Sequence, residues 1–560
     1  MMLNIKSLIS KYKYKFLFII ILMIITSLIN TLLPYIIKQA ISLAENVTSF
    51  NDISGKILVI VVTYMLLSII CAILEYVKYV SLTKNTEALT FQIREETYKK
   101  VISFNMDTFS NMHISTLITR MTADINNIGD FIGRILPMFI GAGIFLIVVL
   151  VVMCFINIYF ALVMIICSAI LVGILLKLGK KMEYYNRKGV ENTEKLNNYF
   201  GETFSGINTI NLFNIQKERK DELEKYNREE TDISKNYFTI QSALNPVEST
   251  TKYLIIAIII YLCIQGKVAG IDIGIIYIVV NYIDKFFEPL AHILYHYENL
   301  QQGRVSIKRI DDLLQRKENI ENIYEGESAE NLEGNIRFKN VNFSYTEGKQ
   351  ILKNVTFSIN KGEKIALVGE TGAGKTTIIN LILGFYKINS GNILFDAKNM
   401  DDISLESIRK NVSFIQQNPF IFDDTIKRNI TINDNNTISD EKIIDILKQV
   451  QLYNKVKKYD NGIYEKVKDN MFSKGEKQLL AFARAIAKET SIYIFDEPTS
   501  NIDVESEIQL KKVIDNLSKD STVIIIAHRP ATIEDVDKIL KVEDGKVVEI
   551  KKETKITNLF

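Results

Sequence analysis

The sequence has no large excess of charge of either sign, and it has little cysteine. Its 560 residues carry 67 Lys and Arg against 65 Asp and Glu, so the formal net charge is only +2. Without a bulk basic excess, the composition gives no reason to expect a nucleic-acid partner. The four cysteines all lie inside apolar runs, where they resemble small buried hydrophobic residues rather than a disulfide framework. They are Cys71, Cys154, Cys167 and Cys263.

Long apolar runs are the main feature of the first half of the chain. Hydrophobic residues make up 48% of the sequence, and nearly all the long runs lie in 1–300, whereas 330–560 has the composition of a soluble α/β domain. A bilayer span needs roughly 20 apolar residues. A single run is equally consistent with a buried core helix, but six runs within one half of the chain favour membrane spans. The six runs are 16–37, 57–78, 135–156, 158–178, the short 253–264, and 271–291, which Asp272, Asp284 and Lys285 interrupt.

The distribution of basic residues predicts the orientation of these spans. Four lysines between Lys6 and Lys15 precede the first run, so the N-terminus is expected in the cytoplasm. The Lys- and Arg-rich segments 79–134 and 179–245 then face the cytoplasm as well, and six spans return the C-terminal half to the same side. The first run is too long for a signal peptide and lacks a small-residue cleavage pattern. We therefore expect a multi-pass protein of the cell membrane with both termini cytoplasmic.

The cytoplasmic segments of the first half have helical character, and several ionisable groups lie near membrane depth. Segments 80–104 and 179–245 contain few glycines and no proline, so the spans are expected to continue as helices into the cytosol.

Ionisable groups in a membrane are costly and tend to face water or each other. Solvated helix faces at the membrane border are one interpretation, and a polar pore lining is the other. A metal or proton site at Glu288, His292 and His296 is less favoured, because two histidines and one glutamate have no further ligand nearby in the sequence. The groups are Glu75 and Lys78, Glu248 and Lys252, and Glu288, His292 and His296, which recur every four residues.

A phosphate-binding loop lies between an expected strand and an expected helix. The apolar stretch KIALVG (364–369) leads into GETGAGKTT (369–377), and the helical IINLILG follows. Glycines allow the backbone N–H groups to surround a β-phosphate at a helix N-terminus. Lys375 is expected to bridge the β- and γ-phosphates of ATP, and the Thr376 hydroxyl to hold Mg²⁺. The predicted nucleotide-binding residues of this loop are Gly369, Glu370, Thr371, Gly372, Ala373, Gly374, Lys375, Thr376 and Thr377.

A second motif places two carboxylates at the end of another apolar strand. The stretch SIYIFDE (491–497) ends in Asp496 and Glu497, at the position where α/β sheets bind ligands. Asp496 is expected to complete the Mg²⁺ site, and Glu497 to polarise the attacking water. His528 follows the strand-like TVIIIA, and by itself it favours a structural role over a catalytic one.

The ordered set of motifs resembles an ATP-binding cassette exporter half-transporter over nearly the whole chain. Tyr345 in FSYTEG matches the adenine-stacking aromatic, and Gln417 in FIQQNPFIF matches the glutamine that links Mg²⁺ and water to the membrane domain. FSKGE (472–476) matches the signature motif. SNID, which ends at Asp503, matches the loop after the Walker B strand, and His528 matches the switch histidine. In the first half, similar segments are FSNMHISTLITRMTAD (109–124), GETFSGINTINLF (201–213) and FFEPL (286–290).

The resemblance implies a fold, a partner and an activity. The expected domains are an all-α six-helix transmembrane domain (1–302), a linker (303–334) and an α/β P-loop NTPase domain (335–560). Ser473 and Gly475 open a helix whose N-terminus would act on the γ-phosphate held by a second subunit. Two chains would then sandwich two nucleotides and export an amphipathic small molecule, lipid or peptide by alternating access. Movement would pass through segments near 107–112 and 209–213.

Two departures from the family pattern leave the identity of the second subunit open. Lys474 stands where many relatives have glycine, Glu476 stands where glutamine is common, and the segment before the signature (464–476) is short and lacks its glycine. A homodimer and a heterodimer both stay possible.

The competing functions are a nucleotide-gated sensor or regulator without net transport, and a soluble DNA-associated ATPase. An importer is disfavoured because importers usually keep the two halves on separate chains. Because the first run begins at residue 16, no peptidase-like domain is expected before it.

Overall fold

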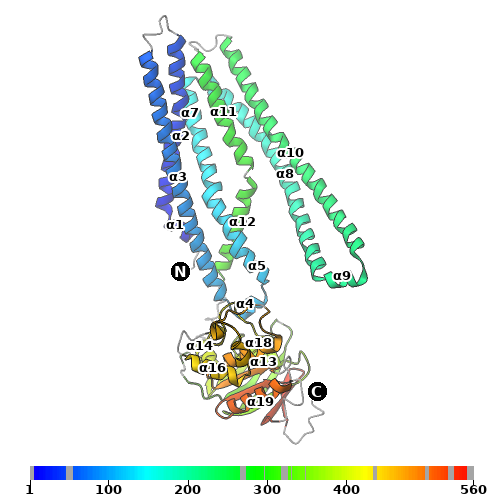
Figure 1. The fold of residues 1–560 in the computed structure, drawn as a ribbon. Helices are drawn as coiled ribbons and strands as arrows, with labels where there is room; N and C mark the ends of the chain where they lie inside the picture. Colours follow the sequence, from blue (N-terminus) through cyan, green and yellow to red (C-terminus); the bar gives the residue numbers. More distant parts are fainter. Residues whose placement is uncertain are drawn as a thin grey trace. The chain divides into compact units, whose positions relative to one another are not determined.

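The computed structural model describes most of the chain. The described residues are 5–45, 54–264, 273–295, 297–316, 326–328, 331–346, 348–432, 438–468, 470–498, 504–527 and 535–550. The chain divides into two compact units, drawn in Figure 1. The first comprises Met1–Lys100 with Ile114–Arg316, and the second comprises Val101–His113 with Lys317–Phe560.

The first unit consists of helices, three of which are far longer than a membrane is thick. The helices α3, α8 and α10 contain 49, 48 and 49 residues, which corresponds to about 70 Å each at 1.5 Å per residue, more than twice the hydrocarbon thickness of about 30 Å. The predicted continuation of the spans as helices is confirmed. The helices of this unit are α1 (Ile5–Lys11), α2 (Lys13–Glu45), α3 (Ser54–Ile102), α5 (Ile114–Thr119), α6 (Ile125–Asp130), α7 (Leu136–Ile156), α8 (Ile158–Ser205), α9 (Ile207–Phe213), α10 (Gln216–Ile264), α11 (Ile273–Tyr295) and α12 (Tyr297–Leu314), with π-helical turns η2 (Arg120–Asp124) and η3 (Phe131–Ile135).

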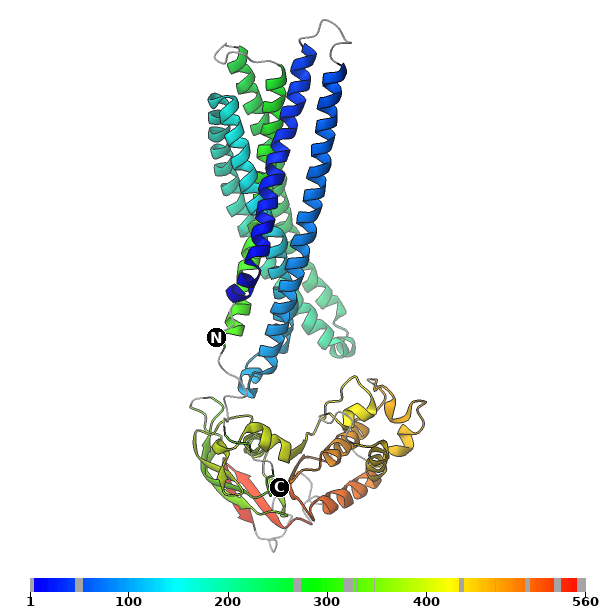
Figure 2. The same ribbon diagram turned by 90° about the vertical axis from the view of Figure 1, so that its left-hand side faces the viewer.

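Local sequence signals explain where these helices break. Between α7 and α8 a single residue, Asn157, is extended (φ −166°), and its side chain accepts a hydrogen bond from the Tyr159 N–H at 2.9 Å. The helix α9 ends at Asn214 in the left-handed conformation (φ 55°), as asparagine tolerates. In both ribbon views α8 and α10 run side by side and are joined through α9 (Figures 1 and 2). The helix α12 continues through 303–314, the first part of the expected linker.

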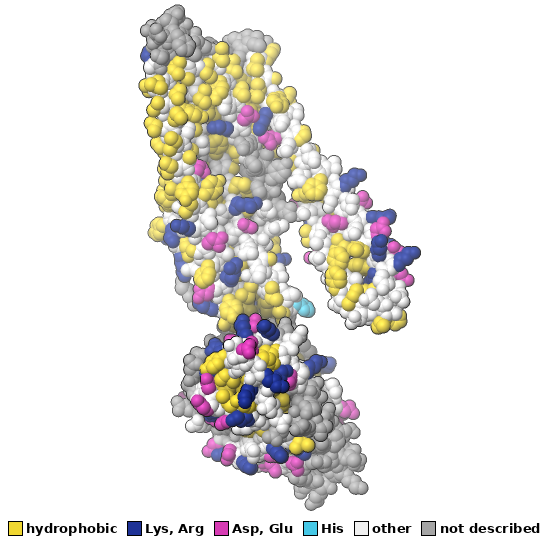
Figure 3. All heavy atoms as spheres, in the orientation of Figure 1, with side chains coloured by type: hydrophobic (Ala, Val, Ile, Leu, Met, Phe, Trp, Pro, Cys, Tyr) yellow, Lys and Arg dark blue, Asp and Glu magenta, His cyan; other side chains and the backbone are white. Residues whose placement is uncertain are grey.

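The outer faces of the membrane half are apolar. Leu58 and Val59 on α3 are 63% and 65% exposed, and Phe155 on α7 is 87% exposed. Hydrophobic side chains cover α2 and α3 in Figure 3. Exposed apolar surface on this scale indicates contact with lipid. Cys154 is exposed on the same surface, so the expectation that it is buried is wrong because the face is apolar without being covered by protein.

Five described helices are long and apolar enough to cross a membrane. The sixth expected span corresponds to α11, which has 23 residues and carries Asp284 and Lys285. A core of Val149, Phe160, Ile255, Tyr282 and Phe287 joins α7, α8, α10 and α11. The five spans are Lys13–Leu43, Gly55–Ile102, Ile114–Ile156, Ile158–Ser205 and Gln216–Leu262.

The second unit contains two sheets and the helices that pack against them. The strand order of the six-stranded sheet is β10-β9-β3-β8-β7-β6, with β10 antiparallel and the rest parallel. The strands β3 and β8 are buried along their whole length, as expected for strands covered on both faces. An antiparallel sheet, β2-β1-β4-β5, was not predicted. The strands are β1 (Ile336–Phe343), β2 (Leu352–Ile359), β3 (Lys364–Val368), β4 (Ser390–Phe395), β5 (Lys398–Asn399), β6 (Val412–Ile415), β7 (Ile492–Asp496), β8 (Thr522–Ile526), β9 (Lys538–Glu543) and β10 (Lys546–Ile550).

The yellow and orange helices of the second unit lie together on one side of it in Figure 2. The helix α18 packs on α15, α16 and β6, and its side chains Leu480 and Phe482 are buried in the core together with Phe495 of β7. The helices are α4 (Met106–Ser110), α13 (Lys375–Ile382), α14 (Leu405–Asn411), α15 (Ile426–Ile430), α16 (Asp440–Gln449), α17 (Tyr453–Val456), α18 (Lys474–Lys488) and α19 (Val504–Leu517), with 3₁₀ turns at Met400–Asp402 and Gly462–Tyr464.

Candidate active site

The predicted phosphate loop connects β3 to the N-terminus of α13. Gly369, Gly372 and Gly374 have φ values of 149°, 87° and 118°, which L-residues rarely adopt. A Cβ on Gly369 would lie 2.2 Å from the Val542 carbonyl oxygen, and one on Gly374 would lie 2.9 Å from Leu352. The loop is therefore a cradle in which backbone N–H groups have room to approach a phosphate closely.

Lys375 begins α13 and lies over this loop. Its side chain is 5% exposed, and Nζ donates to the carbonyl oxygens of Gly369 at 2.6 Å and Glu370 at 2.9 Å. Burial lowers the pKa of Lys375, and the nearby carboxylates of Glu497 and Asp496 oppose that shift. The ammonium group is held by neutral carbonyls that a phosphate oxygen can replace.

The two predicted carboxylates lie at the carboxyl end of β7, next to the ends of β6 and β8. Glu497 has a left-handed backbone (φ 45°), and its N–H donates to the Ile526 carbonyl at 3.2 Å. Gln417, which follows β6, donates from Nε2 to Glu497 Oε2 at 2.6 Å. The sheet thus brings together Lys375, Gln417 and Glu497, residues that lie on three separate stretches of the sequence.

The oxygen donors at this edge fit a magnesium ion. Thr376 is exposed on the first turn of α13, and Asp496 is half-buried at the end of β7. Hydroxyl, carboxylate and amide oxygens are ligands that Mg²⁺ accepts together with phosphate oxygens. Thr376, Asp496 and Gln417 supply one of each type.

Tyr345 lies beside the first turn of the same helix. Its hydroxyl donates to Thr377 Oγ1 at 3.2 Å and accepts from Asn380 at 3.2 Å. The ring packs edge-on against Phe343 and Tyr386, in each case with 4.9 Å between ring centroids, and is 38% exposed. A partly exposed aromatic ring next to the phosphate loop is suitably placed to stack on a base.

The signature segment forms the N-terminus of α18. Ser473 Oγ accepts from the Glu476 N–H at 3.2 Å, and Glu476 accepts from the Ser473 N–H at 2.7 Å, which is a capping box. Glu476 also pairs with Lys455 at 2.6 Å. Burial raises the pKa of Glu476, but the hydrogen bonds from Lys455 and Ser473 outweigh burial and keep that pKa below its usual value. The charge of Glu476 is therefore balanced by Lys455 of the same chain, and Gly475 lies buried beside it.

Two family models match the chain over most of its length. The family model described as "ABC transporter transmembrane region" matches residues 16–290, and the one described as "ABC transporter" matches residues 352–500. The chain belongs to the ATP-binding cassette transporters. It is an ATP-hydrolysing, multi-pass membrane transporter whose relatives are exporters.

Individual relatives resemble the transporter over nearly its whole length. The putative ABC transporter ATP-binding protein exp8 of Streptococcus pneumoniae is 29% identical over 94% of this chain and 89% of its own. The probable multidrug resistance protein YheH of Bacillus subtilis is 29% identical (89% and 74% covered), and an ATP-dependent lipid A-core flippase of Wigglesworthia glossinidia is 27% identical (82% and 80%). A solved bacterial Atm1-family ABC exporter with ATP bound has a TM-score of 0.79 at 19% identity, with 98% of both chains covered, which shows the shared fold.

Sequence reasoning missed two residues that contact this site. Gln478 is fully buried in α18, and its Nε2 donates to the Glu497 carbonyl at 3.1 Å; a lone glutamine in the apolar run QLLAFA is the signal that was available. Lys455 gave no comparable signal. The predicted residues Asp503 and His528, and the side chains of Glu288, His292, His296 and Cys263, lie outside the described parts of the chain.

A short segment between α3 and α5 belongs to the same compact unit as the ATPase domain. Ser110 at the end of α4 hydrogen-bonds to Tyr386, whose ring packs on Tyr345. Burial raises the pKa of Tyr386, and the Ser110 hydrogen bond opposes that shift. Contacts therefore run from α4 through Tyr386 and Tyr345 to Thr377 in the phosphate loop.

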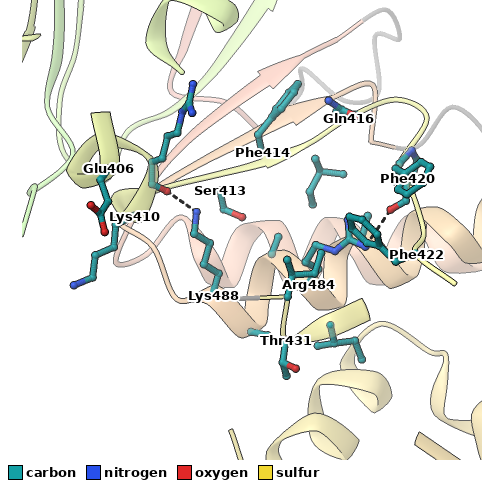
Figure 4. Close-up of a pocket in the computed structure, with 18 of the residues that line it drawn as sticks. Glu406, Lys410, Ser413, Phe414, Gln416, Phe420, Phe422, Thr431, Arg484 and Lys488 are labelled. Carbon is teal, nitrogen blue, oxygen red and sulfur yellow. Dashed lines mark hydrogen bonds between the residues drawn. The ribbon is translucent and has the colours of Figure 1, made fainter. Parts of the chain in front are cut away.

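The ATPase domain also contains a cavity of about 1290 Å³ between β6, α14 and α18 (Figure 4). Phe414, Phe420 and Phe422 line it, together with Arg484 and Lys488. Arg484 donates to the carbonyls of Asn429 and Phe420, and Lys488 donates to those of Arg409 and Val412. Burial lowers the pKa of both side chains.

Proposed function

We propose that this chain is a half-transporter that, as a dimer with an identical or different second subunit, uses ATP to export an amphipathic molecule. The observation that carries the proposal is the convergence of Lys375, Gln417 and Glu497 at one sheet edge, in a chain whose other unit has membrane-length apolar helices. The proposed domains are 1–302, 303–334 and 335–560. Both termini are cytoplasmic in this proposal.

The chain's own residues divide the work at the nucleotide. The cradle from Gly369 to Gly374 and the Lys375 ammonium bind the phosphates, and Tyr345 orients the base. Thr376, Asp496 and Gln417 hold Mg²⁺, which when bound neutralises phosphate charge. Glu497 accepts a proton from the attacking water. Gln417 donates to Oε2 of that carboxylate, and this bond helps to orient Glu497.

Coupling to the membrane uses the segments between the long helices. Leu212 and Phe213 at the end of α9 are 80% and 73% exposed, an apolar tip that is costly in water. We assign the cavity lined by Phe414, Phe420 and Phe422 as the dock for such a tip from the second subunit. Closing the ATPase domains around nucleotide then moves the helices, because ATP binds the closed state more tightly than the open one.

The test is transport by the full chain in inverted membrane vesicles. Wild-type vesicles should accumulate a labelled amphiphile only with ATP, and Glu497→Gln should retain ATP with at least about a hundredfold lower turnover. Glu441→Gln, in the exposed first turn of α16, is the matched control, and it should keep turnover. Turnover at the wild-type rate in Glu497→Gln would refute the role of that carboxylate. Hydrolysis without accumulation of any amphiphile would refute export.

A further inference from the structure

A second cavity, of about 400 Å³, lies among α2, α3 and the start of α7. That volume is within the range of pockets that hold small molecules. All of its lining residues belong to the first compact unit. The residues of α2 and α7 that line it lie within stretches long and apolar enough to cross a membrane.

The lining of this cavity combines two kinds of side chain. The apolar ones include Met23, Leu82, Met138 and Phe145. Gly141 leaves room beside them, because a Cβ there would find no atom nearer than the Met23 sulfur at 3.9 Å. The polar ones are Thr26, Ser27, Asn30, Glu75, Lys78, Tyr79 and Arg134.

Cations outnumber carboxylates among the side chains that line this cavity. Glu75 pairs with Lys78, whose side chain is only 13% exposed. Arg134 has no ion-pair or hydrogen-bond partner among the described residues, and it is exposed at the cavity. The lining side chains thus give two cations, Lys78 and Arg134, against one carboxylate, Glu75.

We infer that this cavity binds an amphiphile with a single acidic group, either a carboxylate or a phosphate. The acidic group lies against Arg134 and Lys78, and the chain lies along Met23, Met138 and Phe145. An arginine guanidinium donates two parallel hydrogen bonds to either anion. A cationic amphiphile would add charge of the same sign at membrane depth, where unbalanced charge is costly. The inference rests on the proposed export function and names its cargo class.

The absence of tryptophan from the chain permits a direct binding assay. A Phe145→Trp reporter in the full chain, in phosphatidylcholine liposomes without nucleotide, is quenched by ω-bromododecanoate or ω-bromododecyl phosphate that enters the cavity. The cationic comparison is ω-bromododecyltrimethylammonium. A Phe155→Trp reporter on the outer face of α7, where Phe155 is 87% exposed, measures partitioning of each probe into the bilayer.

The inference predicts saturable quenching of the Phe145→Trp reporter by one or both acidic probes, and the tighter one identifies the acidic group. Arg134→Gln should raise the half-quenching concentration about tenfold. Arg187→Gln, on an exposed part of α8, should leave it unchanged. Gly141→Leu, which fills the cavity, should abolish saturation.

Equal quenching by the cationic probe, or no change in Arg134→Gln, overturns the inference. Quenching that rises linearly with probe concentration at both reporters, without saturation, overturns it too. Variant folding is checked by retained ATP binding. Because the assay contains no nucleotide, its failure refutes the ligand class alone. Failure of hydrolysis or transport in the vesicle test refutes the proposed function instead.

Discussion

The side-chain amide of Gln417 donates to the carboxylate of Glu497 at 2.6 Å, across 80 residues of sequence. The two side chains come from the ends of adjacent strands, β6 and β7. The amide occupies an oxygen of the carboxylate that is proposed to activate water. Through this hydrogen bond, the position of the Glu497 carboxylate depends on whether Gln417 is in place, and so on whether the site is assembled.

Replacing Gln417 by alanine tests this arrangement. We expect Gln417→Ala to lower the ATP turnover number at least about tenfold, because a positioned polar group is lost, with a smaller change in the ATP concentration at half-maximal rate. Steady-state ATPase assays of the full chain in liposomes measure both. Gln416→Ala removes the neighbouring exposed glutamine and serves as the control. Equal effects of the two substitutions would contradict the assignment.

Gln478 supports Glu497 from the other side. It is fully buried, and its donor satisfies the Glu497 carbonyl at 3.1 Å. We expect Gln478→Ala to lower the free energy of unfolding by about 1–3 kcal/mol, the cost of an unsatisfied buried acceptor and a small cavity. Gln449→Ala, on the exposed end of α16, should change it by less than about 0.5 kcal/mol. Thermal unfolding checks both, and similar shifts would argue against the contact.

The glycine cradle makes a steric prediction. Gly369→Ala should abolish measurable ATP binding, because its Cβ would lie 2.2 Å from the Val542 oxygen at φ 149° and the loop would have to move. Gly362 also has a positive φ (75°), but it has open space around it, so Gly362→Ala should cost only about 1 kcal/mol and leave binding intact. Equilibrium binding of a fluorescent ATP analogue distinguishes the two.

The signature glutamate predicts a pH dependence. Because the pKa of Glu476 is lowered in the folded protein, its contribution to stability is complete above the usual glutamate pKa of about 4.3. That contribution is lost as the pH falls through the lower, folded-state pKa. We expect Glu476→Gln to cost about 1 kcal/mol or less at neutral pH and to weaken the decline of the melting temperature below pH 5. Asp445→Asn, on exposed α16, is the control. If the melting temperature of Glu476→Gln declined below pH 5 as steeply as that of the wild type, the stated cause would be contradicted.

The sequence predicted those parts of the site that depend on local pattern. The loop from Gly369 to Thr377 follows a buried strand and opens a helix, and Asp496 ends another buried strand, so their positions at one sheet edge follow from parallel topology. The contacts made by Gln478 and Lys455 depend on how α18 packs on its neighbours, which spacing alone does not specify. The capping box at Ser473 had a local signal, because glutamate follows serine at the third position.

The long helices were predictable for a similar reason, and the cavities were not. Absence of proline from 179–245 favours long helices, and α8 and α10 occupy most of that segment. The cavity beside Arg134 depends on the packing of three helices, in which Gly141 leaves room near Met23. Such packing is set by side-chain shape across segments far apart in sequence.

The contact between Ser110 and Tyr386 predicts a separation of hydrolysis from coupling. Tyr386→Phe removes the hydroxyl that hydrogen-bonds to Ser110, and it keeps the ring that packs on Tyr345 with 4.9 Å between ring centroids. The nucleotide side of the contact is therefore preserved, and the α4 side is lost. We expect amphiphile-stimulated ATPase activity and vesicle transport to fall severalfold, by about the factor that one lost hydrogen bond implies, and basal hydrolysis to fall less.

The control for this prediction is a second buried tyrosine of the same domain. Tyr493 accepts a hydrogen bond from the Thr490 N–H at 3.1 Å, and none of its hydrogen bonds or ring contacts among the described residues involves α4. Tyr493→Phe should therefore lower stability without changing the ratio of stimulated to basal activity. Should Tyr386→Phe leave that ratio unchanged, while Ser110→Ala also has no effect, the hydrogen bond has no part in coupling. Movement would then have to reach the nucleotide by contacts other than those of α4.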